Sequence, residues 1–218
     1  VIIIGGGGHG LGAAYFLAKE HGITNVAVLE KGWLGGGNTG RNTMTVRSNF
    51  LREDSVPFHE MSLDLYHQLS RDLNYNLMVS QRGMITFVQS SAANRVALQM
   101  ANTMHIYGAE YRMLTLDEVK QKIPIFDPSP DMRLPVRGGV YQPRASMVRH
   151  DAVAWGFARA ADARGVDIIQ NCEVTGIQQE GGAVTGVETN RGVIRAKKIG
   201  MAVAGHGSVV ASMVGQRL

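Results

Sequence analysis

Glycines spaced as Gly5-x-Gly7-x-x-Gly10 form the first pattern that predicts chemistry in this chain. One glycine makes a tight turn, the second lets a pyrophosphate approach the backbone, and the third lets a helix pack closely on a strand. The free amides and dipole at the start of that helix favour a phosphate. Glu30, at the end of the next strand, can accept hydrogen bonds from a ribose. These residues predict a dinucleotide site, and the alternative is a glycine-rich turn without a ligand.

The loop over residues 35–43 is the second segment rich in potential ligand contacts. Its small residues permit the close approach of a flat ring. Asn38, Arg41, Asn42 and Thr43 supply donors for flavin carbonyls and phosphates. We therefore expect this loop to contact a cofactor, and the alternative is a mobile surface loop.

His150 stands between Arg149 and Asp151, where we expect Asp151 to be the N-cap of a helix that continues to Arg164. A neutral imidazole at a helix start can act as a base or form a covalent bond. Taken alone, a surface or capping histidine is the simpler interpretation. The other histidines lack metal-ligand spacing, so we predict no metal site, and no catalytic residue can be assigned.

The elements that must position these residues follow from the apolar pattern. Helical periodicity predicts helices over about 11–20, 55–72, 91–105 and 151–164, and a capping box at 115–118 opens a further short helix. Apolar runs predict strands over 1–4, 25–30, 84–88, 139–141, 166–170 and 199–204. Turn signals at 181–182 and 190–192 divide three further short strands into a β-meander.

The order of these elements favours FAD over NAD, because a plain NAD domain would continue with alternating strands and helices. We predict an α/β chain whose FAD-binding, glutathione-reductase-like Rossmann domain carries a β-meander, together with part of an α+β substrate domain. The FAD-binding domain is expected to be discontinuous, over 1–75 and 147–218, and residues 76–146 to form part of the substrate or cap domain. The C-terminal half of the full protein is expected to lie outside these residues.

Composition excludes several classes of function. The net charge is +4 and no run of Lys and Arg exceeds two residues, so the basic stripe of a nucleic-acid-binding protein is missing. The single cysteine, Cys172, precludes a disulfide within the chain and fits a reducing compartment. No apolar run is long enough to span a bilayer. We predict a cytoplasmic protein without a membrane or nucleic-acid partner.

The sequence resembles the β subunits of heterotetrameric sarcosine oxidases along essentially its whole length. Four glycines followed by His9 are more specific than the general fingerprint. The other matching segments are 21–32, 36–38, 41–43, 47–49, 149–151 and 153–159. The sequence departs from the family's pattern at 39–40 and 44–46, within the loop.

The resemblance implies noncovalent FAD on this chain and a second flavin, FMN, bound covalently to a histidine that by motif is His150. It implies demethylation of sarcosine at FAD and reduction of oxygen to hydrogen peroxide at FMN, giving glycine and formaldehyde, or methylene-tetrahydrofolate when folate is present. It also implies an α subunit that binds NAD and folate, and γ and δ subunits.

The resemblance also implies cofactor contacts beyond those inferred from the residue types and spacing. Val174 is expected to touch the adenine through its backbone, and Arg41 and Arg47 to reach a flavin or its phosphate. The full predicted set is Gly5, Gly7, Gly8, His9, Gly10, Glu30, Asn38, Arg41, Asn42, Thr43, Arg47, Val174 and Gly205. Two other readings stay open: another FAD-dependent amine or D-amino-acid oxidoreductase of the same superfamily, and a flavin-binding scaffold without catalysis.

Overall fold

The computed structural model describes residues 1–50 and 52–217, which divide into two compact units. The first unit comprises residues 1–43, 71–77 and 149–218, and the second comprises 44–70 and 78–148. Because the arrangement of the two units relative to each other is not determined, each is described by itself.

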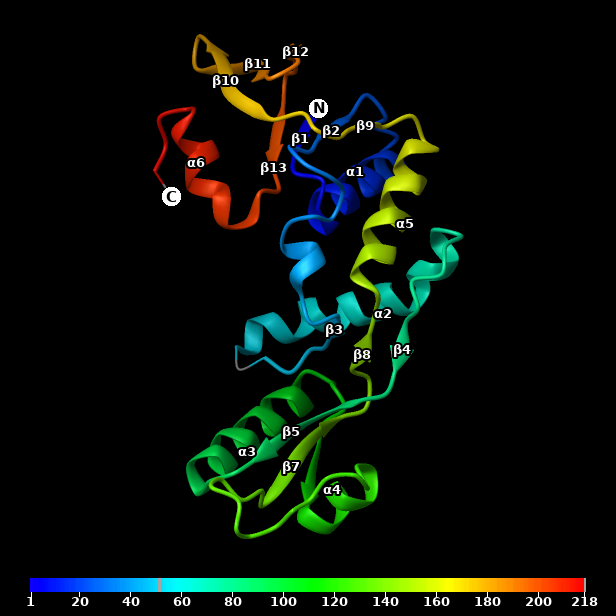
Figure 1. Ribbon diagram of the computed structural model, residues 1–218, viewed down its shortest axis with the longest axis vertical. Coiled ribbons are helices and arrows are strands. Elements are labelled where there is room, and N and C mark those ends of the chain that lie inside the picture. Colours follow the sequence, from blue (N-terminus) through cyan, green and yellow to red (C-terminus); the bar gives the residue numbers. More distant parts are fainter. Residues whose placement is uncertain (51, 218) are drawn as a thin grey trace. The chain divides into compact units, whose positions relative to one another are not determined.

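A parallel sheet is the centre of the first unit (Figure 1). Its strand order is β13 (Ile199–Met201), β1 (Ile2–Ile4), β2 (Ala27–Leu29) and β9 (Asp167–Ile169). All residues of β1 are buried, as expected of a central parallel strand. Helices α1 (Gly8–His21) and α5 (His150–Asp162) pack against each other, and a Cβ on Gly12 would lie only 3.5 Å from the ring of Phe157.

The predicted meander follows β9 in the first unit. Strands β10 (Val174–Glu180), β11 (Ala183–Thr189) and β12 (Gly192–Arg195) form an antiparallel sheet, with positive φ at Gly181 and Gly182 in its first turn. Val187 of β11 is buried in one cluster with Ile2 and Leu29 of the parallel sheet, so the two sheets share a core. The chain continues through η3 (Ala204–His206) and α6 (Gly207–Ser212).

The second unit is built on a three-stranded antiparallel sheet, ordered β5 (Met84–Val88), β7 (Gly138–Gln142) and β6 (Arg112–Thr115). Helices α3 (Ser91–Ile106) and α4 (Leu116–Lys122) accompany it, and the predicted capping box between Thr115 and Glu118 is confirmed. Short strands β3 (Thr45–Val46), β8 (Ser146–Met147) and β4 (Ser80–Gln81) form a second sheet. Helix α2 (Val56–Asp72) begins in this unit, after η2 (Glu53–Ser55).

The predicted helices and strands all occur, but several of their ends differ from the prediction: α1 begins at Gly8 rather than residue 11, and α5 ends at Asp162 rather than Arg164. Arg149, not Asp151, is the N-cap of α5, because the Asp151 carboxylate is bound by the Arg149 guanidinium. The last strand of the sheet ends at Met201 rather than residue 204, so Gly205 lies in the turn η3. The sequence also missed strands β3, β4 and β8, since two residues cannot show periodicity, and it missed strand β6 and helix α6.

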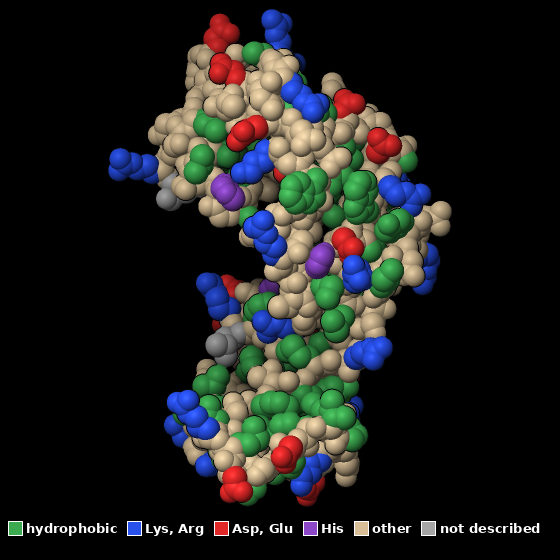
Figure 2. All heavy atoms as spheres, viewed as in Figure 1, with side chains coloured by type: hydrophobic (Ala, Val, Ile, Leu, Met, Phe, Trp, Pro, Cys, Tyr) green, Lys and Arg blue, Asp and Glu red, His purple; other side chains and the backbone are tan. Residues whose placement is uncertain are grey.

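None of the helices in the described segments has the length and apolar character needed to cross a membrane. Figure 2 shows Lys and Arg side chains dispersed among acidic and apolar ones on the visible face.

Candidate functional site

The glycine turn joins β1 to α1, and two of its glycines are required by the backbone itself. Gly5 has φ +110°, and a Cβ there would lie 2.4 Å from the carbonyl oxygen of Ala202. A Cβ on Gly10 would lie 2.0 Å from the carbonyl oxygen of Gly5. The first and last glycines of the fingerprint therefore allow the turn and the close packing of α1, as predicted from their spacing.

The predicted ribose acid, Glu30, directly follows β2 and is tied to this turn. Its Oε2 accepts a hydrogen bond from the Gly6 amide at 2.8 Å, and its Oε1 accepts one from the Gly32 amide at 2.8 Å. Its backbone is fixed by hydrogen bonds with Ile169 and Cys172 at 2.9 Å each. Each carboxylate oxygen can accept a further hydrogen bond, so the side chain remains able to bind ribose hydroxyls.

Thr39 is a residue of the site that the sequence did not reveal. Its Oγ1 accepts a hydrogen bond from the Gly8 amide at 2.9 Å, and its carbonyl accepts one from the Asn42 side chain at 2.6 Å. The turn η1 (Asn38–Arg41) is thereby folded back onto the start of α1. Spacing gave no signal for this contact, because the two partners are 31 positions apart in the sequence.

The start of α1 fits a phosphate group. Its N-cap, Gly7, provides no side-chain cap, and no acidic residue lies in the first turn. Within the described residues, the amides of His9 and Gly10 have no protein acceptor. These two donors lie at the positive end of a 14-residue helix. The turn, its open amides and Glu30 thus make a cradle that suits a dinucleotide.

The other predicted contacts are less closely linked to this turn. Asn38, Arg41, Asn42 and Thr43 lie on or next to η1 with exposed side chains. Val174 begins β10 and packs at the edge of the cluster that contains Leu29.

Two further predicted residues lie apart from the turn. Gly205 is exposed in η3, and a Cβ there would meet nothing within 4 Å. Arg47 belongs to the second unit, so the structure does not place it relative to the glycine turn.

His150 is the first residue of α5, with 22% of its side chain exposed. Its Nδ1 is buried without a hydrogen-bond partner in the described part of the chain. Arg149 donates two hydrogen bonds to Asp151, which hold the pKa of that carboxyl below its usual value. The positive charge beside His150 is therefore partly offset by the neighbouring carboxylate.

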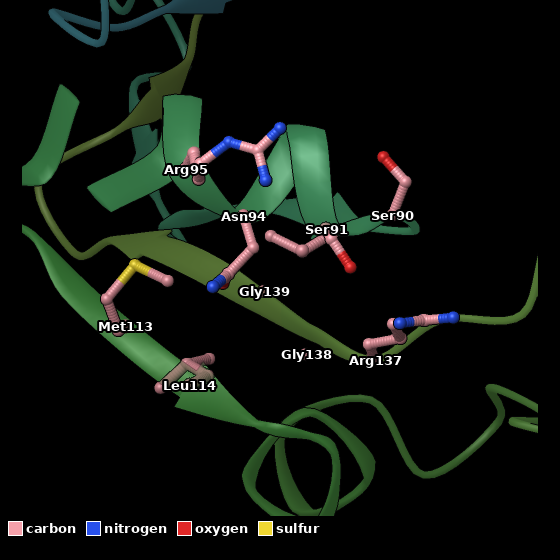
Figure 3. A pocket seen from close by; sticks show the side chains of 10 residues that line it. Ser90, Ser91, Asn94, Arg95, Met113, Leu114, Arg137, Gly138 and Gly139 are labelled. Atoms are coloured by element: carbon pink, nitrogen blue, oxygen red, sulfur yellow. The ribbon is translucent and has the colours of Figure 1, made fainter. Parts of the chain in front are cut away.

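A cavity of about 400 Å³ lies in the second unit, between the first turn of α3 and the sheet (Figure 3). Asn94 and Ser91 extend from α3 toward the strands. Its lining contains none of the predicted cofactor residues and consists of Val88, Ser90, Ser91, Asn94, Arg95, Met113, Leu114, Arg137, Gly138 and Gly139. Among the described residues, no three His, Cys, Asp or Glu side chains are grouped to hold a metal ion.

Comparison with known proteins agrees with this site. A family model described as FAD dependent oxidoreductase matches residues 1–218. The chain is 53% identical to sarcosine oxidase subunit beta of Rhizobium meliloti and 50% identical to that of Arthrobacter sp, in each case over 218 residues. All of this chain is aligned with 52% and 54% of those proteins, so the chain spans about half their length.

A solved structure, L-proline dehydrogenase from P. horikoshii, has the same fold. The TM-score is 0.90 at 24% identity, over 98% of this chain and 55% of that one. The predicted fold class, that of an FAD-binding α/β oxidoreductase, is confirmed.

Proposed function

Because this chain belongs to the FAD dependent oxidoreductase family, we propose that it is the FAD-binding part of an enzyme that demethylates sarcosine. The observation that carries the cofactor assignment is the glycine turn, with Glu30 and Thr39 bound to its amides. The identity of about half the residues to proteins named sarcosine oxidase subunit beta supports the substrate.

FAD, when bound, would supply the electron acceptor for oxidation of the amine. The chain's own residues would hold it: Glu30 through the ribose hydroxyls, and the amides of His9 and Gly10 through the pyrophosphate. Asn38 and Asn42 would donate to the flavin or its phosphates. In this proposal the first unit is the FAD-binding domain and the second is part of the substrate domain.

The overall reaction converts sarcosine, oxygen and water to glycine, formaldehyde and hydrogen peroxide. When folate is present, tetrahydrofolate is consumed in place of water and methylene-tetrahydrofolate forms in place of formaldehyde. The amine reacts as the neutral base, because removal of a hydride from its methyl group needs the nitrogen lone pair. No residue of this chain is assigned as the base.

His150 is proposed as the covalent anchor of FMN. Because Nδ1 is buried, Nε2 is the ring nitrogen that remains for attachment. The proposed enzyme is a cytoplasmic heterotetramer in which α, γ and δ subunits accompany this chain. NAD and folate are proposed to bind the α subunit. The name "subunit beta" of the relatives supports a multisubunit assembly.

A second candidate is another FAD-dependent amine or D-amino-acid oxidoreductase of the same superfamily, which the fold shared with L-proline dehydrogenase also allows. In that case His150 would only begin the helix α5 and would carry no flavin. A flavin-binding scaffold without catalysis would show neither covalent flavin nor turnover.

The test is to purify the full-length protein with its partner subunits and to measure peroxide formed from sarcosine. After acid denaturation, we expect part of the yellow colour to remain on this chain and to be lost in His150→Ala, while FAD is retained. Release of all flavin from the wild-type protein would disprove the role of His150. An absence of peroxide would refute the oxidase proposal.

A further inference from the structure

Arg47 is an arginine without a carboxylate partner among the described residues. Its Nη1 donates to Oδ1 of the buried Asn49 at 2.7 Å, and its guanidinium lies 4.9 Å from the centre of the Phe50 ring. Both contacts are to neutral groups. The guanidinium is thus oriented by the protein, while its charge remains available to an anionic ligand.

The Phe50 ring is itself held by a second aromatic residue. His59, in the first turns of α2, stacks on it with ring centres 3.9 Å apart and planes inclined by 22°. Both side chains are half-buried. Stacking of this kind restricts a ring beyond the effect of burial alone. A series of contacts therefore runs from His59 through Phe50 to Arg47.

Among the charged groups around this stack, Arg47 is the one that acts on His59, and the others described below are paired elsewhere. Burial, and then the positive charge of Arg47, lower the pKa of His59. Glu60, the next residue of α2, forms an ion pair with Arg144, and burial raises the pKa of the nearby Tyr111. Arg144 also pairs with Asp64 of α2, and Arg52 pairs with Asp54 before the helix. Arg47 is therefore the charge that acts on His59.

We infer that His59 is a positioning residue, which through Phe50 fixes the Arg47 guanidinium in the orientation that binds an anionic group. The inference rests on the proposed function, in which that group belongs either to the substrate carboxylate or to the flavin cofactor. Both sources present negatively charged oxygens, which a guanidinium binds with paired hydrogen bonds.

Occupation of Arg47 by an anion also has a consequence for His59. The anion offsets the charge that disfavours protonation of the imidazole, so the pKa of His59 rises when the anion binds. Binding is then linked to uptake of a proton, and anion affinity increases as the pH falls. A residue with only a structural role in α2 would not give this linkage.

The first test compares variants of the full-length protein with its partner subunits. We expect His59→Ala to raise KM for sarcosine about 3- to 10-fold with a smaller effect on kcat, because Arg47 loses its fixed orientation. His59→Phe, which keeps the stacked ring, should restore KM. The control is His67→Ala, on the same helix, whose ring bonds the Ser146 hydroxyl at 3.0 Å. It should leave KM unchanged.

The source of the anion follows from the same variants. If Arg47 binds the cofactor, His59→Ala will lose FAD on purification and KM will change little. If neither KM nor FAD content differs from the wild type, the inference is overturned. Equal defects in His59→Ala and His59→Phe would also overturn it, since stacking would then not be the cause.

The second test uses acetate, a carboxylate without an amine, and follows the change in flavin absorbance. Between about pH 8 and pH 6, where acetate stays ionised, its affinity for the wild type should increase, and that of His59→Phe should not. A pH dependence retained in His59→Phe would overturn the inference. For a substrate carboxylate as the anion, this measurement decides the matter if His59→Ala fails to fold, and it is independent of sarcosine turnover. For the cofactor, the FAD content of purified His59→Phe, expected to equal that of the wild type, takes its place.

Discussion

Replacement of Glu30 by alanine tests whether this side chain recognises a ribose or only supports the turn. The carboxylate accepts hydrogen bonds from the amides of Gly6 and Gly32, both at 2.8 Å. The variant therefore loses bonds within the protein as well as those to a ligand. A hydrogen bond to a charged group contributes about 1.5–3 kcal/mol, so we expect FAD affinity to fall by about 1–3 kcal/mol, or roughly 5- to 150-fold.

Reduced affinity alone cannot separate the two roles, so the assay is a double-mutant cycle with nucleotides. ADP and 2′-deoxy-ADP are compared as competitors of FAD on the apoprotein, in the wild type and in Glu30→Ala. If Glu30 binds the ribose, the wild type will prefer ADP by about 1–3 kcal/mol, and the variant will lose most of this preference.

The reasoning is refuted if both proteins discriminate equally between ADP and 2′-deoxy-ADP. In that case Glu30 acts only on the amides of Gly6 and Gly32. Glu20→Ala is the matched control, because Glu20 is an exposed acid at the other end of α1, paired with Lys19 at 3.1 Å. Glu20→Ala should leave the affinities for ADP and for 2′-deoxy-ADP unchanged.

Four further predictions concern this chain. Thr39→Val removes the acceptor of the Gly8 amide, so we expect it to lower the unfolding free energy by about 1 kcal/mol and to weaken FAD binding. Thr39→Ser keeps the hydroxyl and should change neither quantity. If thermal unfolding and FAD titration give the same values for Thr39→Val as for the wild type, the contact has no importance. Gly8→Ala should fold but bind FAD weakly, and Gly10→Ala should not fold stably, as circular dichroism will show. His150→Ala should abolish acid-stable flavin without loss of FAD. The folded-state pKa of His59 lies below its ordinary value of 6.5, so the stability that its neutral form contributes is lost as the pH falls below 6.5. Urea unfolding above and below this pH should show a smaller loss of unfolding free energy in His59→Phe than in the wild type. Equal losses in the two proteins would contradict this prediction.

The parts of the fold that sequence predicted are those encoded locally. The strand, turn and helix at the N-terminus follow from three buried isoleucines and glycines at fixed spacing, and the capping box of Thr115 and Glu118 lies within one turn. The N-cap of α5 was wrong for a related reason. Asp151 has the right side chain for capping, but Arg149 competes for its carboxylate, and propensity does not weigh such a competitor.

The parts that sequence could not predict depend on contacts across the chain. Thr39 reaches Gly8 only because η1 folds back over the turn. The stack of Phe50 on His59 depends on a contact between residues nine positions apart, and neither residue belongs to a motif. For the predicted cofactor residues, the sequence indicated residue types and spacing. Which backbone amides are already bonded within the protein depends on the folded structure, as at Gly6 and Gly8.

The glycine turn between β1 and α1 contains more glycines than its backbone conformation requires. Gly5 and Gly10 are required by the fold, since a Cβ at either would overlap a backbone oxygen. A Cβ on Gly8 would meet only the Thr39 side chain, at 3.8 Å, so the protein itself tolerates one there. Its absence is therefore best explained by a ligand that approaches the backbone. Because Thr39 and Glu30 already order the turn, that ligand would bind donors whose positions are fixed in advance, at a lower entropic cost.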